Sequence, residues 1–402
     1  MTDAPSRVLI AGGGTGGHVF PMIAVGEALA RERPDVHVTY VGTGRGIEAR
    51  VVPGVGGVLE RLDVLPLRGR GLGGFVRGAL RAVLVMREAR RLVERLDPDV
   101  VFSVGGYAAG PVTLAAKSCG VPVTLMEPNA VLGFTNRLLS RLVQRAYVCF
   151  PETRRGFDPD VVRWTGVPLR KRFEPMPYAP QGPVRVLVMG GSQGALALNE
   201  VLPRAFATLI SEGQSVRITH QTGKGKDAQV HGLYGQLDLA EHVRIVTFID
   251  DVAAALGEAD LVIERAGAGS LAELCAVGRP GLLVPYPHAA DDHQRHNAES
   301  LARDGAAVCV VQRDATVERL TDELRGLLGD ERRRRRMAER AAGRGRPEAA
   351  RNIARDLLAL GDVYRGRRSA LSVDEEQRTD HAERRLVAAS SHLRAVSEEV
   401  PS

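Results

Sequence analysis

The chain has 402 residues, of which 44% are hydrophobic, 25% charged and 4% aromatic, and its formal net charge is +6. This composition excludes a disordered, fibrous or disulfide-stapled protein, and the length predicts about two to three domains. The four cysteines include no Cys-x-x-Cys pair, so neither a disulfide framework nor a zinc ribbon is indicated. No apolar run reaches the roughly 18 residues of a spanning helix, and the first residues lack signal-peptide features, so we expect a cytoplasmic protein.

Strand-like apolar runs recur along the first half of the chain, each followed by a glycine turn and a helix-like segment. They cover residues 7–10, 37–41, 100–104, 121–125 and 146–149. Alternation of strands and helices predicts a parallel sheet with helices on both faces.

A proline-rich passage at residues 168–183 interrupts this rhythm, which then restarts. The second set of runs covers residues 184–189, 216–220, 243–248, 261–263, 281–285 and 307–311. Prolines between two such sets are typical of a linker. The sequence therefore predicts an α/β protein in which two nucleotide-type lobes face each other across a cleft.

Both lobes open with a strand that runs into a glycine-rich turn and a helix, an arrangement that binds phosphate. The first turn, residues 12–17, matches the Gly-x-Gly-x-x-Gly dinucleotide fingerprint. The acidic ribose ligand of that fingerprint is missing at the end of the second strand, residues 41–44. The sequence also has no P-loop motif, so dehydrogenases and P-loop NTPases are disfavoured.

His18 follows the first turn directly and would project into the crevice at the carboxyl ends of the strands. Its near-neutral pKa makes it a candidate general base. The alternative is that His18 only hydrogen-bonds to a neighbouring loop, and its position in the sequence does not separate the two roles.

In the second lobe, small residues at Ala268, Gly269 and Ser270 open a helix whose N–H groups could bind a diphosphate. Glu273, one turn further on, could accept both hydroxyls of a ribose, or could merely complement the helix dipole. The His and Asp residues within 288–296 lack metalloprotease spacing, and we favour sugar contacts there over a metal site. The arginine run at 332–336 has no interleaved aromatic residues, which favours a solvated helix face over a nucleic-acid site.

Several blocks together resemble the MurG family, the UDP-N-acetylglucosamine:N-acetylmuramyl-(pentapeptide) pyrophosphoryl-undecaprenol N-acetylglucosaminyltransferases. In the family's order, they are residues 12–21 (GGGTGGHVFP), 105–107 (GGY), 127–136, 190–195 (GGSQGA), 248–251 (FIDD), 265–273, 292–294 (DHQ) and 297–298 (NA). The resemblance implies a GT-B fold with two Rossmann-like lobes. It implies an acceptor and membrane-facing lobe at residues 1–168, joined by a C-terminal helix at about 347–361, and a UDP-sugar lobe at 169–346. Residues 362–402 are expected to be a polar tail outside the fold.

The resemblance also assigns site residues. Ser192 resembles a phosphate contact, Ile249 the backbone contact to uracil, and Glu273 the ribose ligand. Contacts to the substrates are implied at Thr15, Gly16, Gly17, Tyr107, Asn129, Arg170, Ala268, Gly269, Ser270, His293 and Gln294. The chain departs from the family at Met126 and Pro128, within a block that often contains His-Glu-Gln-Asn, and at Val167, where Asn is common.

The implied reaction is an inverting transfer of N-acetylglucosamine to the C4 hydroxyl of the muramyl sugar of lipid I, which gives lipid II for peptidoglycan synthesis. His18 is the expected base, with Glu127 as the second candidate. No Asp-x-Asp motif is evident at a donor site, so we expect no metal held by the protein. A divalent cation bound to the substrate diphosphate is an alternative that the sequence leaves open. The rivals are a diglyceride glycosyltransferase, a UDP-N-acetylglucosamine 2-epimerase and a noncatalytic nucleotide-sugar-binding protein.

Residues 61–95 contain nine arginines against three acidic residues, interleaved with apolar residues at helical spacing. One interpretation is a helix that packs its apolar stripe on the first lobe. The other is an interfacial patch in which Leu72, Phe75 and their neighbours enter an anionic membrane. We therefore expect a peripheral protein on the cytoplasmic face of the plasma membrane, with an undecaprenyl-linked acceptor and no nucleic-acid partner.

Overall fold

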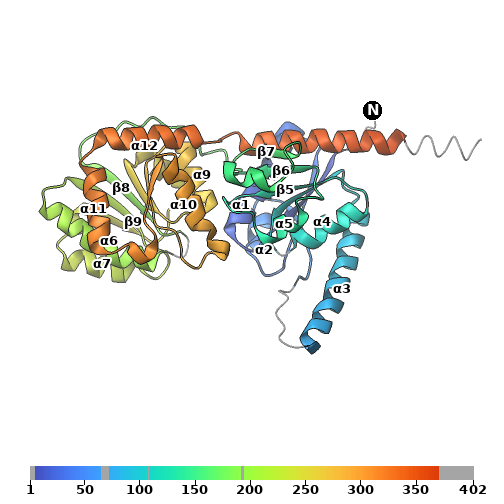
Figure 1. The fold of residues 1–402 in the computed structure, drawn as a ribbon, viewed down its shortest axis with the longest axis horizontal. Helices are drawn as coiled ribbons and strands as arrows, with labels where there is room; N and C mark the ends of the chain where they lie inside the picture. The colour runs from blue at the N-terminus through green and yellow to red at the C-terminus, as the bar shows by residue number, and fades with distance from the viewer. Residues whose placement is uncertain (1–4, 65–71, 107, 192–193, 371–402) are drawn as a thin grey trace, which may run out of the picture.

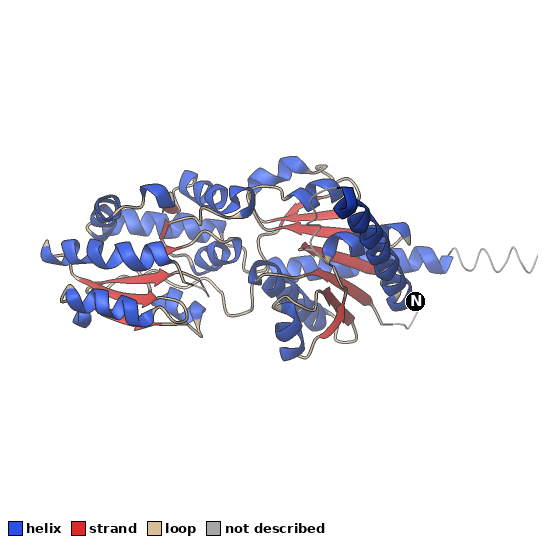
Figure 2. Cartoon of the chain, turned by 90° about the horizontal axis from the view of Figure 1, so that it is seen from below, coloured by secondary structure: helices blue, strands red, loops and turns tan. Residues whose placement is uncertain are grey.

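The computed structural model describes the chain except for residues 1–4, 65–71, 107, 192–193 and 371–402, and describes residues 72–81 by their backbone alone. Two α/β lobes lie side by side (Figure 1). Each contains one parallel sheet, with strand order β3-β2-β1-β4-β5-β6-β7 in the first lobe and β10-β9-β8-β11-β12-β13 in the second. Helices cover both faces of each sheet (Figure 2), as the alternation of apolar runs predicted.

The first lobe contains every strand predicted there and two more at its edges. Its elements are β1 (Arg7–Gly12), α1 (Gly16–Glu32), β2 (His37–Gly42), α2 (Glu48–Gly54), β3 (Val58–Arg61), α3 (Leu72–Leu96), β4 (Val100–Gly105), α4 (Ala109–Ser118), β5 (Val123–Glu127), α5 (Phe134–Leu139), β6 (Arg145–Val148) and β7 (Val162–Trp164). β3 and β7 were not predicted, because both are short, partly exposed edge strands without a continuous apolar run.

The second lobe contains all six predicted strands. Its elements are β8 (Val184–Met189), α6 (Leu196–Ser211), β9 (Val216–Gln221), α7 (Asp227–Gln236), β10 (Val243–Val246), α8 (Val252–Glu258), β11 (Leu261–Glu264), α9 (Ala268–Val277), β12 (Gly281–Leu283), α10 (His293–Arg303), β13 (Ala307–Cys309), α11 (Val317–Leu328) and α12 (Glu331–Arg344). Within the arginine run, Arg334 is buried and donates to the carbonyls of Leu327 and Leu328 at the end of α11. The expectation of a solvated face is therefore wrong for this residue, which caps the preceding helix.

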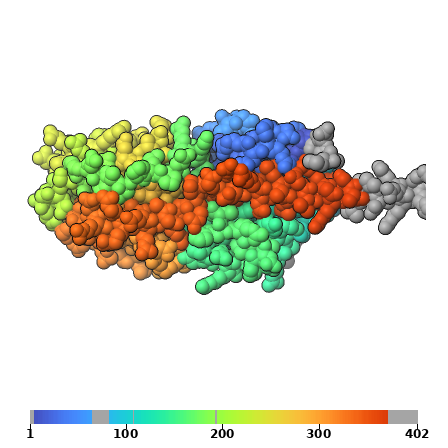
Figure 3. Space-filling view, turned by 90° about the horizontal axis from the view of Figure 1, so that it is seen from above, coloured from blue at the N-terminus to red at the C-terminus, as the bar shows by residue number. Residues whose placement is uncertain are grey.

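A C-terminal helix, residues 349–370, leaves the second lobe and packs on the first. It runs along that lobe as the orange-red segment in Figure 3. Ile353 and Leu357 are fully buried and belong to the apolar cluster that includes Val8 and Ile10 of β1. The helix closes one face of the first lobe's sheet.

The predicted tail was expected to lie outside the fold from residue 362, which is wrong for its first part. The C-terminal helix continues to residue 370 and is tied to the first lobe by ion pairs. Asp362 pairs with Arg33, and Arg368 pairs with Asp97, each at 2.7 Å. The remainder, 371–402, lies outside the described residues.

Candidate functional site

The first glycine turn sets the position of His18. Gly13 and Gly14 have φ angles of 141° and 93°, which favour glycine, and α1 begins two residues later. Thr15 and Gly17 are exposed at this turn, and Gly16 is partly buried. Nδ1 of His18 lies 3.2 Å from the Gly13 carbonyl oxygen, and Nε2 faces Gly105 at the end of β4.

This geometry defines the protonation of His18. A carbonyl only accepts hydrogen bonds, so Nδ1 carries the proton and Nε2 keeps its lone pair. Burial lowers the pKa of His18 below its usual value, although the Gly13 carbonyl partly opposes this. The imidazole is therefore neutral at pH 7 and can accept a proton at Nε2. Tyr107, which follows the adjacent glycine pair, lies outside the described residues.

Glu127, the second candidate base, is buried at the end of β5 and fully engaged. Oε1 accepts the backbone N–H and the side-chain amide of Asn129, at 3.1 and 3.3 Å. Oε2 accepts from the Gly133 backbone and the Asn136 side chain, each at 2.9 Å. Burial raises its pKa despite these donors. The arrangement indicates a carboxyl that organises the 127–136 loop rather than one free to receive a substrate proton.

Asn129 lies at a contact between the lobes. Its Oδ1 accepts from the side-chain amide of Asn297 of α10 at 3.1 Å. Asn297 is fully buried, accepts the Ala130 backbone N–H at 2.7 Å and donates to the carbonyl of Ala266 at 3.2 Å. A chain of hydrogen bonds thus joins Glu127 in the first lobe to the turn before α9 in the second.

The start of α9 and Glu273 form the expected donor side of the cleft. Ala268, Gly269 and Ser270 occupy the first turn, and no described side chain caps it, so its N–H groups are available to an anion. Burial raises the pKa of Glu273 to about 7, and Arg170 partly opposes this shift. Arg170 also stacks over Phe20 of α1, 5.3 Å from the ring centroid, and thus lies between the lobes.

Glu264, to which the sequence analysis gave no role, is buried at the end of β11. Neither carboxylate oxygen has a hydrogen-bond partner among the described residues. Burial, and then the charge of Glu273, raise its pKa well above the usual value. The only signal in the sequence was an acidic residue that closes an apolar strand.

The first turn of α10 presents His293 and Gln294. Oε1 of Gln294 accepts the Tyr286 backbone N–H at 3.0 Å, and Nδ1 of His293 lies 2.7 Å from the Ala290 carbonyl oxygen. Asp291 and Asp292 both adopt a left-handed backbone with φ of 51°, which makes this a strained turn. No group of three or more potential ligands in the described part of the chain is arranged to bind a metal ion.

Two donor-side candidates remain, Ser192 and Ile249. Ser192 lies outside the described residues. The second glycine turn is held by Gln221 at the end of β9, whose side-chain amide donates to the Gly191 carbonyl at 2.9 Å. Ile249 lies in the loop between β10 and α8 and packs partly on the apolar core.

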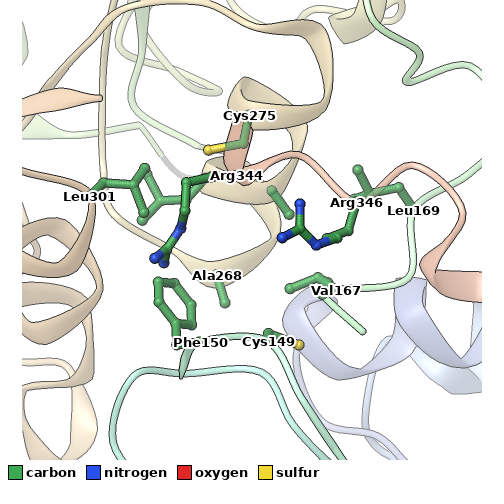
Figure 4. A pocket seen from close by; sticks show the side chains of 12 residues that line it. Cys149, Phe150, Val167, Leu169, Ala268, Cys275, Leu301, Arg344 and Arg346 are labelled. Carbon is green, nitrogen blue, oxygen red and sulfur yellow. The ribbon is translucent and has the colours of Figure 1, made fainter. Parts of the chain in front are cut away.

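A cavity between the lobes contains Val167, one of the departures from the family pattern (Figure 4). Its lining includes Val167 from the first lobe together with Ala268, Leu271 and Cys275 of α9. Val167 is 4% exposed, so an apolar side chain replaces the common asparagine within an apolar contact. Met126 is likewise fully buried in the core of the first lobe.

Comparison with known proteins agrees with this geometry. Residues 8–148 match the glycosyltransferase family 28 N-terminal domain, and residues 185–353 match the family's C-terminal domain. A UDP-N-acetylglucosamine--N-acetylmuramyl-(pentapeptide) pyrophosphoryl-undecaprenol N-acetylglucosamine transferase from Sorangium cellulosum is 59% identical over 90% of each chain. The enzyme of the same name from Anaeromyxobacter dehalogenans strain 2CP-C is 46% identical over 88% of this chain and 93% of its own.

The crystal structure of Acinetobacter baumannii MurG has a TM-score of 0.75 and 32% identity, covering 88% of this chain and all of the other. The chain belongs to the MurG family of glycosyltransferases. The GT-B fold expected from the sequence is confirmed. A UDP-N-acetylglucosamine 2-epimerase from Neisseria meningitidis, 14% identical with a TM-score of 0.62, shares only this fold. Within the described ranges of this MurG-family chain, every helix is too short or too polar to span a bilayer.

Proposed function

We propose that this protein transfers N-acetylglucosamine from UDP-N-acetylglucosamine to the C4 hydroxyl of the muramyl sugar of lipid I, which yields lipid II and UDP. The substrates follow from the names of the relatives, which match over nearly the whole chain. The observation that carries the mechanism is the neutral His18 imidazole, with its Nε2 lone pair free, close enough to the second lobe that the charge of His293 lowers the pKa of His18.

In the proposed reaction, Nε2 of His18 takes the proton of the C4 hydroxyl as its oxygen attacks the anomeric carbon of the donor. The bond from that carbon to the diphosphate oxygen breaks, and UDP leaves with the electron pair. A single displacement inverts the anomeric configuration. The uncapped N–H groups at the start of α9 stabilise the leaving diphosphate.

The other residues are assigned to binding. Glu273 accepts the ribose hydroxyls, and Gln294 with His293 contacts the sugar. Glu127 orders the 127–136 loop and positions Asn129, because it accepts four hydrogen bonds from donors of that loop. The chain itself contributes no metal ligands in this proposal, and a divalent cation would arrive on the diphosphate.

We also propose that α3 binds an anionic membrane on the cytoplasmic side, beside the acceptor cleft. The helix projects from the first lobe in Figure 1. Its C-terminal part is anchored, because Ala89, Leu92 and Val93 are buried, whereas Val83 and Leu84 are 51% and 60% exposed. Buried anchors in the C-terminal part of α3 and exposed apolar residues between arginines in its middle favour an interfacial patch.

The test is incubation of the protein with UDP-N-acetylglucosamine and lipid I, followed by measurement of UDP release and of a disaccharide lipid. An epimerase would instead produce the 2-epimer of the donor, and a diglyceride transferase would require a diacylglycerol acceptor. Binding of the donor without turnover of either acceptor would reduce the protein to a nucleotide-sugar-binding role.

A further inference from the structure

A buried carboxylate lies directly against the first glycine turn. Glu48, the first residue of α2, has 0% of its surface exposed. Its Oε2 accepts the backbone N–H of Gly14 at 2.8 Å. Its Oε1 accepts the backbone N–H and the hydroxyl of Thr43, at 2.9 and 2.8 Å. Glu48 therefore connects the turn after β1 to the turn after β2.

The surrounding backbone is shaped to receive this side chain. A Cβ built on Gly13, Gly42 or Gly46 would collide with the Glu48 side chain. Burial opposes the ionisation of Glu48, but the donors from Gly14 and Thr43 outweigh it, and its pKa is below the usual value. Glu48 is thus a fixed negative charge where the turn of a nucleotide-binding lobe would meet a phosphate.

One peptide group joins Glu48 to His18. The N–H of the Gly13–Gly14 peptide belongs to Gly14 and donates to Glu48, and its C=O belongs to Gly13 and accepts from Nδ1 of His18 at 3.2 Å. Hydrogen bonds in such a chain polarise one another. We infer that Glu48 is a positioning residue for His18, which acts through this peptide group to fix the imidazole tautomer and orientation.

This inference rests on the proposed role of His18 as base. Two charged groups act on His18: Glu48, which is hydrogen-bonded to the first glycine turn, and His293 of α10 in the other lobe. The charge of Glu48 raises the pKa of His18, whereas burial and His293 lower it. Removal of the charge should therefore lower the pKa of His18 further.

The main variant is Glu48→Gln, because an amide has one acceptor oxygen and must turn its NH₂ toward the N–H of either Gly14 or Thr43. With a water-soluble acceptor, we expect kcat to fall roughly 10- to 100-fold, within the range of general-base effects. The acid limb of the pH profile should move to lower pH, while the affinity for UDP-N-acetylglucosamine stays unchanged. In a His18→Ala background, Glu48→Gln should have almost no further effect, because its target is gone.

Two matched variants separate charge from geometry. Glu48→Asp keeps the charge but is one methylene shorter, so kcat should fall with the acid limb near its original pH. Thr43→Val removes the hydroxyl, which donates to Oε1 of Glu48 and accepts the Gly46 backbone N–H, but keeps the backbone N–H bond of residue 43 to Oε1, and it should have a small effect. If Glu48→Gln does not fold, the loss caused by Glu48→Asp must likewise disappear in the His18→Ala background.

The inference would be overturned if Glu48→Gln lowered kcat by the same factor in the parent protein and in the His18→Ala background. It would also be overturned if the acid limb of the pH profile did not move in Glu48→Gln. If His18→Ala abolishes turnover while Glu48→Gln is silent, only the inference about Glu48 fails. If His18→Ala leaves turnover intact, the proposed base is wrong and the inference fails with it.

Discussion

Donor binding should depend on the ionisation of Glu273. Burial raises the pKa of this carboxyl to about 7, and the positive charge of Arg170 only partly opposes the shift. An ionised carboxylate accepts hydrogen bonds at both oxygens, whereas a protonated one must donate at one of them. The two hydroxyls of a ribose therefore bind best to the ionised form.

The size of the effect follows from this pKa. With a folded-state pKa of about 7, the ionised fraction falls from about nine-tenths at pH 8 to about one-tenth at pH 6. The affinity for UDP-N-acetylglucosamine should therefore fall about tenfold as the pH drops across this window. Glu273→Ala should weaken binding at pH 8 by about tenfold or more, because a charge-assisted hydrogen bond contributes roughly 1.5–3 kcal/mol.

The assay is calorimetric titration with UDP-N-acetylglucosamine and no acceptor. This ligand lacks the terminal phosphate of UDP, whose own pKa near 6 would add a second titration. Glu273→Gln should bind weakly with no pH dependence in this range, and His18→Ala should retain the pH dependence of the parent protein. A dissociation constant that stays flat from pH 8 to 6, or a pH dependence retained in Glu273→Gln, would refute the reasoning.

Three further outcomes are expected. His18→Ala should lower kcat by roughly 10² to 10⁴ with little change in UDP affinity, measured by UDP release. Val83→Ser with Leu84→Ser should weaken binding to anionic vesicles by roughly tenfold in a sedimentation assay, because both side chains are exposed. Leu357→Ala should reduce the free energy of unfolding by about 2–5 kcal/mol in urea titrations, because Leu357 is fully buried.

Each of these three predictions can be contradicted by a specific result. A loss of UDP affinity as large as the loss of kcat would assign His18 to diphosphate binding. Equal binding to neutral and anionic vesicles would leave α3 as an ordinary packed helix, and turnover of a soluble acceptor should be unchanged in the Val83 and Leu84 variant. A neutral Leu357→Ala would mean that the C-terminal helix does not complete the core of the first lobe.

The fold was largely accessible from the sequence because its strands are short, apolar and bounded by glycine turns. Buried parallel strands leave such continuous runs, whereas β3 and β7, the edge strands of the first lobe, leave none and were therefore missed. His18 and Glu273 could be predicted from the sequence because each follows a glycine-rich or small-residue helix start. Their pKa values could not be predicted, since the burial of these side chains depends on both lobes.

Contacts between distant segments could not be predicted. Glu48 lies 34 residues beyond its partner Gly14, in a segment with no motif of its own. The bond between Asn129 and Asn297 spans 168 residues and requires the two lobes to meet. Glu127 was the second candidate base, and only the four hydrogen bonds that it accepts indicate a different role.

The path of the C-terminal helix affects how the protein is made. The first lobe is synthesised before the second, yet one face of its sheet is covered by residues 349–370, which are synthesised only after the second lobe. The second lobe has its own sheet and can fold in between. A chain that stops before residue 349 would therefore leave the apolar surface around Val8 and Ile10 open to water and to aggregation. The lobe that begins folding first is the last to be completed.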